Sequence, residues 1–241
     1  MTSVLTPGQN GVPQTLLIDA DDTLWENNIY FERALADFIS FLEHKELSPA
    51  EVREIINEVE RENIKLHGYG LRSFTKALVA SFERLSVEPI TEAIHMTITG
   101  FAQKIAEEPI RLIDGVAETL EYLHGRHALY VVTKGDRDEQ QHKVASSGLA
   151  SRFAAVEVVH EKNAACYLEI VERHGLRAEE TWMVGNSPKS DINPALGAGL
   201  NAVFVPHDNT WVLEHEEVAA PQSPGQKLLR LGSFKELALH F

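Results

Sequence analysis

The chain has few of the features that disulfide-stabilised or membrane-spanning proteins need. Cys166 is its single cysteine, which excludes an intramolecular disulfide and favours a reducing compartment. No apolar run approaches the ~20 residues that a membrane-spanning helix requires. Residues 1–14 lack the basic and then apolar pattern of a signal peptide and are expected to form a frayed arm. These absences predict a cytoplasmic protein without a membrane partner.

Positive charge is also scarce. The 22 Lys and Arg residues are outnumbered by 36 Asp and Glu residues, so the net charge is −14. Such an acidic surface repels nucleic acid and anionic lipid, and neither is expected as a partner. The negative charge is compatible with a divalent cation that carries an anionic substrate into an otherwise repulsive binding site. The apolar share of 44% is ordinary for a globular protein of one or two domains.

Strand and helix patterns alternate through most of the chain. The predicted strands cover residues 16–18, 128–132, 155–159, 181–184, 202–205 and, at an edge, 227–231. The predicted helices between and after them cover residues 115–125, 136–147, 163–174, 189–198 and a short segment from 233. This alternation is typical of right-handed βαβ units. It predicts an α/β fold with a Rossmann-like, three-layer core and a parallel sheet.

Residues 27–108 have a different pattern. Four helices and no strand are predicted there, at residues 28–44, 48–66, 71–85 and 90–106. The second of these helices begins at a capping box, Ser48-Pro49-Ala50-Glu51. We therefore expect an inserted all-helical domain at 27–108, and a core made of residues 1–26 and 109–241. The insertion leaves the core just after the first strand and is well placed to cover the residues that follow that strand.

Three acids follow the first strand within four positions: Asp19, Asp21 and Asp22. Open α/β sheets bind their ligands at the carboxyl ends of the strands. Asp19 and Asp21 are two residues apart, so on an extended backbone they share a face. They could hold one hard cation such as Mg²⁺ between them. The alternative is an acidic turn in which Asp22 or Thr23 caps a helix.

Polar groups also follow three later strands. Thr133 and Lys134 precede a glycine and a helix start, an arrangement that can bind an oxyanion or can be a simple capped turn. Lys162 can neutralise a carboxylate and a phosphate together, or can be a solvated loop lysine. Asn186 and Asp191 offer a neutral and a charged oxygen to a metal, or belong to a capped helix start. Because parallel strands end at one edge of a sheet, all these groups are expected to meet there.

Taken in this order, the residues resemble the motifs of the haloacid dehalogenase superfamily. The matching segments are Asp19-Ala20-Asp21-Asp22-Thr23-Leu24, Val131-Val132-Thr133-Lys134-Gly135, Lys162, and Gly185-Asn186-Ser187 with Asp191. The resemblance covers about residues 15–206, and the helical insertion stands where the family has its helical cap. It implies a phosphatase-type hydrolase with a helical cap of the kind called C1.

The resemblance implies a Mg²⁺-dependent phosphomonoester hydrolase that acts on a small phosphorylated metabolite. Asp19 would attack phosphorus and form an aspartyl-phosphate. Asp21 would protonate the leaving group and then activate water. Thr133 and the amide of Lys134 would bind phosphoryl oxygens. Lys162 would offset the negative charge of the phosphate.

The implied metal ligands are Asp19, the backbone carbonyl of Asp21, and Asn186 or Asp191. The family more often has aspartate where this chain has Asn186, so we expect weaker metal affinity but not inactivity. The alternatives are a phosphomutase, a 2-haloacid dehalogenase and a non-catalytic binding or regulatory relative. Asp21 favours phosphoryl transfer, because a dehalogenase needs neither a metal nor an acid for its leaving group. A monomer or a homodimer is expected.

Three further groups of residues are singled out. The candidates for substrate specificity flank a break at Gly68 and Gly70, which can equally be an ordinary turn: Lys65, His67, Tyr69 and Arg72. Two aromatic residues near the start of the insertion are interpreted as packing residues: Trp25 and Tyr30. Three residues after the strand at 202–205 lack compact metal-ligand spacing and are interpreted as a surface or dimer contact: His207, Trp211 and His215.

Overall fold

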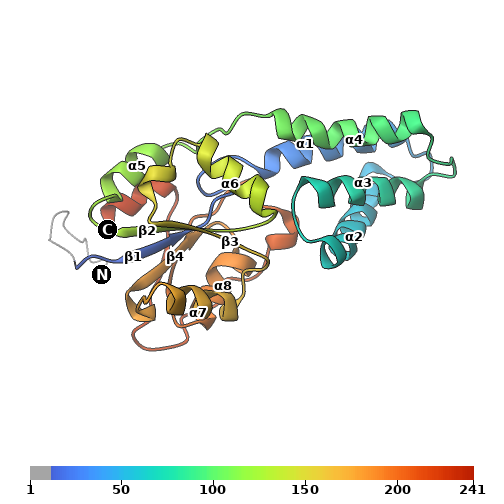
Figure 1. Cartoon of the computed structure of the whole chain (residues 1–241). Helices are drawn as coiled ribbons and strands as arrows, with labels where there is room; N and C mark the ends of the chain where they lie inside the picture. Colours follow the sequence, from blue (N-terminus) through green and yellow to red (C-terminus); the bar gives the residue numbers. More distant parts are fainter. Residues whose placement is uncertain (1–11) are drawn as a thin grey trace.

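A six-stranded parallel sheet forms the centre of the computed structural model, which describes residues 12–241 (Figure 1). Its strand order is β3-β2-β1-β4-β5-β6, and every neighbouring pair is parallel. The strands are β1 (Thr15–Ile18), β2 (Ala128–Lys134), β3 (Ala155–Val159), β4 (Thr181–Gly185), β5 (Asn201–Phe204) and β6 (Leu228–Arg230). All six predicted strands are therefore present. The order places β1 and its acids in the middle of the sheet, where ligands of such folds bind.

Helices cover both faces of this sheet. One face carries α5 (Val116–Leu123), α6 (Arg137–Ser146) and the 3₁₀ helix η5 (Phe234–Leu239), and the other carries α7 (Ala164–Arg173) and α8 (Asn193–Gly197) (Figure 1). Side chains of a strand alternate between the faces. Accordingly, Leu16 and Ile18 pack in the cluster that includes Leu120 of α5, whereas Leu17 packs with Tyr167 of α7. The predicted three-layer, Rossmann-like α/β fold is confirmed.

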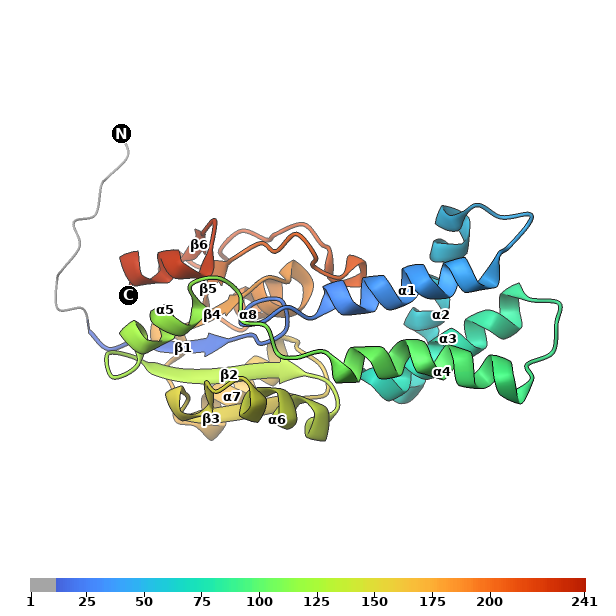
Figure 2. The same cartoon turned by 90° about the horizontal axis from the view of Figure 1, so that it is seen from above.

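The four helices that directly follow β1 form a separate bundle. They are α1 (Asn28–Leu42), α2 (Pro49–His67), α3 (Leu71–Leu85) and α4 (Glu92–Glu107). Phe38, Ile56, Leu78 and Ile98, one from each helix, meet in an apolar cluster of their own. Figure 2 shows the bundle beyond the carboxyl ends of the strands. The fold is thus a parallel-sheet core with an inserted all-helical part, as predicted.

The bundle joins the core through two adjacent chain segments. The amide of Glu26 donates to the carbonyl of Arg111 (2.9 Å), and the amide of Ile113 donates to the carbonyl of Leu24 (3.0 Å). The predicted capping box at the start of α2 is also present: the carboxylate of Glu51 accepts a hydrogen bond from the amide of Ser48 at 2.8 Å. The division of the chain at 26/27 and 108/109 remains a prediction.

The helix predicted at 189–198 is not continuous. It consists of a π-helical turn, η3 (Pro188–Ile192), followed by α8. Pro194 has no amide hydrogen and cannot bond to the carbonyl of Ser190, as a continuous α-helix requires. That carbonyl instead accepts a hydrogen bond from the hydroxyl of Tyr167 at 2.9 Å. The proline therefore explains the change of helix type.

The remaining short 3₁₀ turns are η1 (Ala150–Arg152), η2 (Ala178–Glu180) and η4 (Val212–Glu214). None of the helices within residues 12–241 combines the length and the apolar character that crossing a bilayer demands. Most of the arm predicted at residues 1–14 lies outside the described residues. Gln14 itself is held, because its amide donates to Nδ1 of His127 (3.1 Å).

Candidate active site

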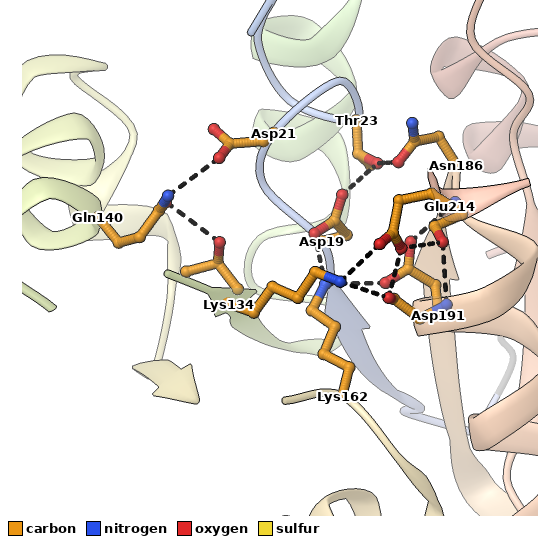
Figure 3. A network of polar contacts seen from close by, with 12 residues as sticks. Asp19, Asp21, Thr23, Lys134, Gln140, Lys162, Asn186, Asp191 and Glu214 are labelled. Carbon is orange, nitrogen blue, oxygen red and sulfur yellow. Dashed lines mark hydrogen bonds and ion pairs between the residues drawn. The ribbon is translucent and has the colours of Figure 1, made fainter. Parts of the chain in front are cut away.

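Asp19 lies directly after β1, at the centre of the carboxyl edge of the sheet. Its amide donates to the carbonyl of Val184 on β4 (2.9 Å), which extends the sheet by one residue. Its carboxylate is buried and accepts two hydrogen bonds, from Nζ of Lys162 at 2.5 Å and from the hydroxyl of Thr23 at 2.8 Å (Figure 3). Both oxygens of Asp19 are therefore oriented by specific partners.

Lys162 lies between two buried carboxylates. Its ammonium contacts Oδ1 of Asp191 at 2.8 Å as well as Asp19. Although burial alone lowers the pKa of an ammonium, the two carboxylates raise the pKa of Lys162 above its ordinary value. Burial and the charge of Asp19 raise the pKa of Asp191. One ammonium therefore faces two carboxyl groups inside the protein.

Asp191 reaches this position because Gly185 ends β4. A Cβ atom at residue 185 would lie only 2.2 Å from Oδ2 of Asp191. The π-helical turn brings Asp191 back over the strand end, where Oδ2 accepts from the amide of Ser187 at 2.9 Å. Asn186 lies beside it, and its Oδ1 accepts from the hydroxyl of Thr23 at 3.3 Å. The structure therefore brings Asp19, Lys162, Asp191 and Asn186 into one connected cluster.

Asp21 has a different environment. Its carboxylate points away from Asp19 and accepts a hydrogen bond from Nε2 of Gln140 at 3.0 Å (Figure 3). It also accepts hydrogen bonds from Nζ of Lys143 (2.9 and 3.0 Å) and from the indole of Trp25 (2.7 Å). Burial alone would raise the pKa of Asp21. The charge of Lys143 and the three donors outweigh this effect and lower it. The side-chain oxygens of Asp19 and Asp21 thus have separate partners and do not converge on one point.

Thr133 and Lys134 end β2, and their side chains point in different directions. The hydroxyl of Thr133 donates to Oε1 of Gln140 (3.1 Å), whose amide group also holds Asp21. The ammonium of Lys134 donates to Glu214 (2.7 Å) and to the hydroxyl of Ser190 (2.8 Å). Thr133 therefore belongs to the Asp21 side of the site, and the Lys134 side chain to the Asp191 side.

Sequence reasoning missed three residues of this site. Glu214, from η4, is buried and accepts from Lys134 and from the hydroxyls of Ser187 and Ser190, and these contacts keep its pKa low despite burial. Gln140 and Lys143 lie on α6, three residues apart, and reach the same carboxylate. Their spacing in the helix that follows Thr133 is the one local signal that could have identified them.

A cavity of about 610 Å³ lies between this cluster and the helical bundle. Of the four specificity candidates, Tyr69 lines it, whereas Lys65, His67 and Arg72 are exposed and do not. The Tyr69 hydroxyl donates to Glu161 of the core at 2.7 Å. The bundle and the core are thus in direct contact beside the cavity.

The interpretation of His207 and Trp211 as surface contacts is wrong. Trp211 lines the cavity and packs edge-to-face against Tyr69, with ring centroids 6.4 Å apart. The ring of His207 lies between Asp22 and Glu26, at 4.0 and 3.4 Å, and these three side chains are close enough together to hold a metal ion. The loop after β5 folds over the site, which local ligand spacing does not reveal.

The other interpretations have simpler outcomes. His215 is exposed. Trp25 and Tyr30 are buried, as packing residues should be, but both also line the cavity. Asp22 accepts hydrogen bonds from the amides of Asn27 and Asn28 at the start of α1, so the capping alternative is correct for this one acid.

Comparison with known proteins identifies the family to which the chain belongs. Residues 13–199 match the sequence model of the haloacid dehalogenase-like hydrolases. A haloacid dehalogenase-like family hydrolase from Xanthomonas campestris is 26% identical, with a TM-score of 0.80 over 98% of this chain and 93% of its own. The L-2-haloacid dehalogenase from Xanthobacter autotrophicus has the same fold at 18% identity, with a TM-score of 0.62 over 95% of this chain and 98% of its own.

A curated relative is the phosphoserine phosphatase of Thermus thermophilus, which is 28% identical over 117 residues. That match spans 46% of this chain and 43% of the relative, so less than half of either protein is aligned. The family match is broader and covers the strand ends that build the site. The chain belongs to the haloacid dehalogenase-like hydrolases.

Proposed function

We propose that this hydrolase is a Mg²⁺-dependent phosphomonoesterase that acts through a phosphoryl group on Asp19. The observation that carries the proposal is the pair Asp19 and Asp21, two carboxylates that line one cavity with different partners. Pairs of acids in unlike surroundings are typical of sites where one acts as nucleophile and the other as acid and base. The partial similarity to a phosphoserine phosphatase agrees with this division of roles.

In the first half-reaction, an oxygen of Asp19 attacks phosphorus. The bond between phosphorus and the ester oxygen breaks, and Asp21 supplies the proton to that oxygen; Asp21 must be protonated at this step, although Lys143 favours its ionised form. Thr133 and the backbone amide of Lys134 bind the phosphoryl oxygens, and Lys162 holds Asp19 and offsets its charge. In the second half-reaction, Asp21 takes a proton from water, which attacks phosphorus and frees Asp19.

The residues present fit a magnesium ion. The buried cluster combines the carboxylates of Asp19 and Asp191 with the amide oxygen of Asn186, and hard oxygen ligands of this kind suit Mg²⁺. Within this cluster, Lys162 is one ammonium shared by the two carboxyl groups. These three side chains and the carbonyl of Asp21 would hold the ion. When bound, it supplies positive charge that screens the carboxylate from the phosphate.

A second candidate is a 2-haloacid dehalogenase, since such an enzyme shares the fold. Displacement of a halide needs a nucleophile such as Asp19 but no acid, because a halide leaves without a proton. The set of donors around Asp21 has no evident purpose in that reaction. Asp21 therefore favours the phosphatase. A small phosphorylated metabolite remains the proposed substrate class.

The test is phosphate release from p-nitrophenyl phosphate with Mg²⁺ and with EDTA, set beside chloride release from 2-chloropropionate. We expect metal-dependent phosphate release by the wild type, its loss in Asp19→Asn, and no chloride release. Chloride release without phosphate release would overturn the proposal. Phosphate release that persists in Asp19→Asn would show that Asp19 is not the nucleophile.

A further inference from the structure

The wall of the cavity away from the sheet contains a buried acid. Glu60, Asn63 and Ile64 of α2 line the cavity that also contains Asp19. Spacings of three and four residues place these side chains on one face of the helix. Glu60 is only 6% exposed. A carboxyl group is thus built into the bundle side of the cavity.

No donor within residues 12–241 satisfies Oε2 of Glu60, although that atom is buried. The polar groups nearby are already engaged: Arg53 pairs with Glu32 at 2.8 Å and with Asn57 at 2.8 Å, and Asn63 donates to Ser73. A buried polar atom without a partner costs free energy and calls for an explanation. Burial also raises the pKa of Glu60 to about 7. A donor supplied by a ligand would remove this cost.

The wall of the cavity that contains Glu60 and Asp19 is mainly apolar. Its aromatic and aliphatic members include Tyr30, Phe31, Leu35, Phe74 and Ile105. Glu60 lies seven residues before the end of α2 at His67, a rise of roughly 10 Å along the helix axis at 1.5 Å per residue. Tyr69, just beyond that end, contacts the core. Because Glu60 lies about two helical turns away from this contact, we expect a ligand that touches both Glu60 and Asp19 to need an extended apolar body.

We propose that Glu60 determines specificity by accepting a hydrogen bond from an amino group at the far end of the substrate. The substrate class is a phosphomonoester whose apolar chain or ring carries that amino group. An ammonium would pair with the Glu60 carboxylate, and the apolar walls would enclose the body between the two ends. We expect esters of two-carbon and three-carbon acids to be too short to reach Glu60 from Asp19. The inference rests on the proposed phosphatase activity.

The experiment compares 6-aminohexyl phosphate with hexyl phosphate, which differ only in the terminal amino group. For the wild type we expect kcat/KM to be about tenfold or more higher with the amino compound, as a charge-assisted hydrogen bond warrants. Glu60→Gln should bring the two values together. Glu62→Gln, at an exposed position of the same helix, should keep the wild-type ratio.

A shorter pair tests the reach of Glu60 without any variant. The wild type should not discriminate 2-aminoethyl phosphate from ethyl phosphate, because the amino group cannot reach Glu60. Two outcomes would overturn the assignment of Glu60: equal kcat/KM of the wild type for 6-aminohexyl phosphate and hexyl phosphate, or an unchanged ratio of these two kcat/KM values in a folded Glu60→Gln. Hydrolysis of p-nitrophenyl phosphate by the wild type separates this result from failure of the phosphatase proposal, because that ester is too short to need Glu60.

Discussion

Nζ of Lys143 lies 2.9 Å from one carboxylate oxygen of Asp21 and 3.0 Å from the other. The ion pair joins α6 to the loop after β1, and the same ammonium donates to Asn27 at 2.8 Å. It keeps the pKa of Asp21 below its usual range, although burial acts in the opposite direction. Lys143 is thus a positioning residue for the proposed acid and base.

Replacing Lys143 by methionine should slow turnover while keeping the fold. Without its ion pair, Asp21 loses orientation, and kcat for p-nitrophenyl phosphate should fall about tenfold to a hundredfold. Steady-state kinetics that separate kcat from KM measure this. Lys104→Met is the matched control, because Lys104 pairs with Asp37 on the surface of the bundle. An unchanged kcat in Lys143→Met would remove Lys143 from the mechanism.

Lys162→Met should destabilise the core. The substitution leaves the carboxylates of Asp19 and Asp191 facing each other without the ammonium that both contact. The free energy of unfolding, measured in the presence of EDTA, should fall by about 3–5 kcal/mol, which is the usual cost of removing one member of a buried ion pair. Urea denaturation measures the change, and adding Asp191→Asn to Lys162→Met should recover part of it. A loss below about 1 kcal/mol would mean that the cluster is not a tightly packed ion network.

Gly185→Ala should disturb the position of Asp191. The added methyl group would overlap Oδ2 of Asp191, whereas an alanine at Gly197 meets its nearest neighbour, Ala164, at 3.6 Å. We expect Gly185→Ala to lose about 1–3 kcal/mol of stability and Gly197→Ala to lose none. Thermal unfolding of the two variants gives the comparison. Equal stability of both would show that η3 can shift without cost.

Stability should depend on the ionisation of Glu60. Because burial raises its pKa from 4.5 to about 7, the folded state binds more protons than the unfolded state between these values. This contribution to stability is present at low pH and is lost as the pH rises through both pKa values. Between about pH 5 and pH 8 the wild type should lose about 2.5 kcal/mol relative to Glu60→Gln. Parallel pH profiles for the two proteins would contradict a buried, unpartnered carboxyl group.

The core and much of the site could be predicted because their signals are local. The aliphatic run at 16–18 defines a buried strand, and strand direction brings Asp19 to the same edge as Lys162 and Asp191. The capping box at Ser48 likewise marks the start of α2 correctly. Each of these features depends on residues close together in the sequence.

The partners of Asp21 and the buried acids could not be predicted in this way. Helix α6 is polar on nearly all sides, so its apolar periodicity does not indicate which face turns to the site, and the spacing of Gln140 and Lys143 is the one local signal that remains. Glu214 reaches the site through a loop whose path depends on tertiary packing. Glu60 lies on the cavity side of an amphipathic helix, where a sequence pattern suggests a solvated acid.

The proposed mechanism requires that Asp19 becomes phosphorylated during turnover. The most direct measurement is mass spectrometry of peptides from wild-type protein that has been mixed with p-nitrophenyl phosphate and Mg²⁺ and quenched in acid. We expect one phosphoryl group on the peptide that contains Asp19, and none on the corresponding peptide of Asp19→Asn. Release of phosphate without this modification, or a phosphoryl group on another residue, would show that Asp19 is not the nucleophile.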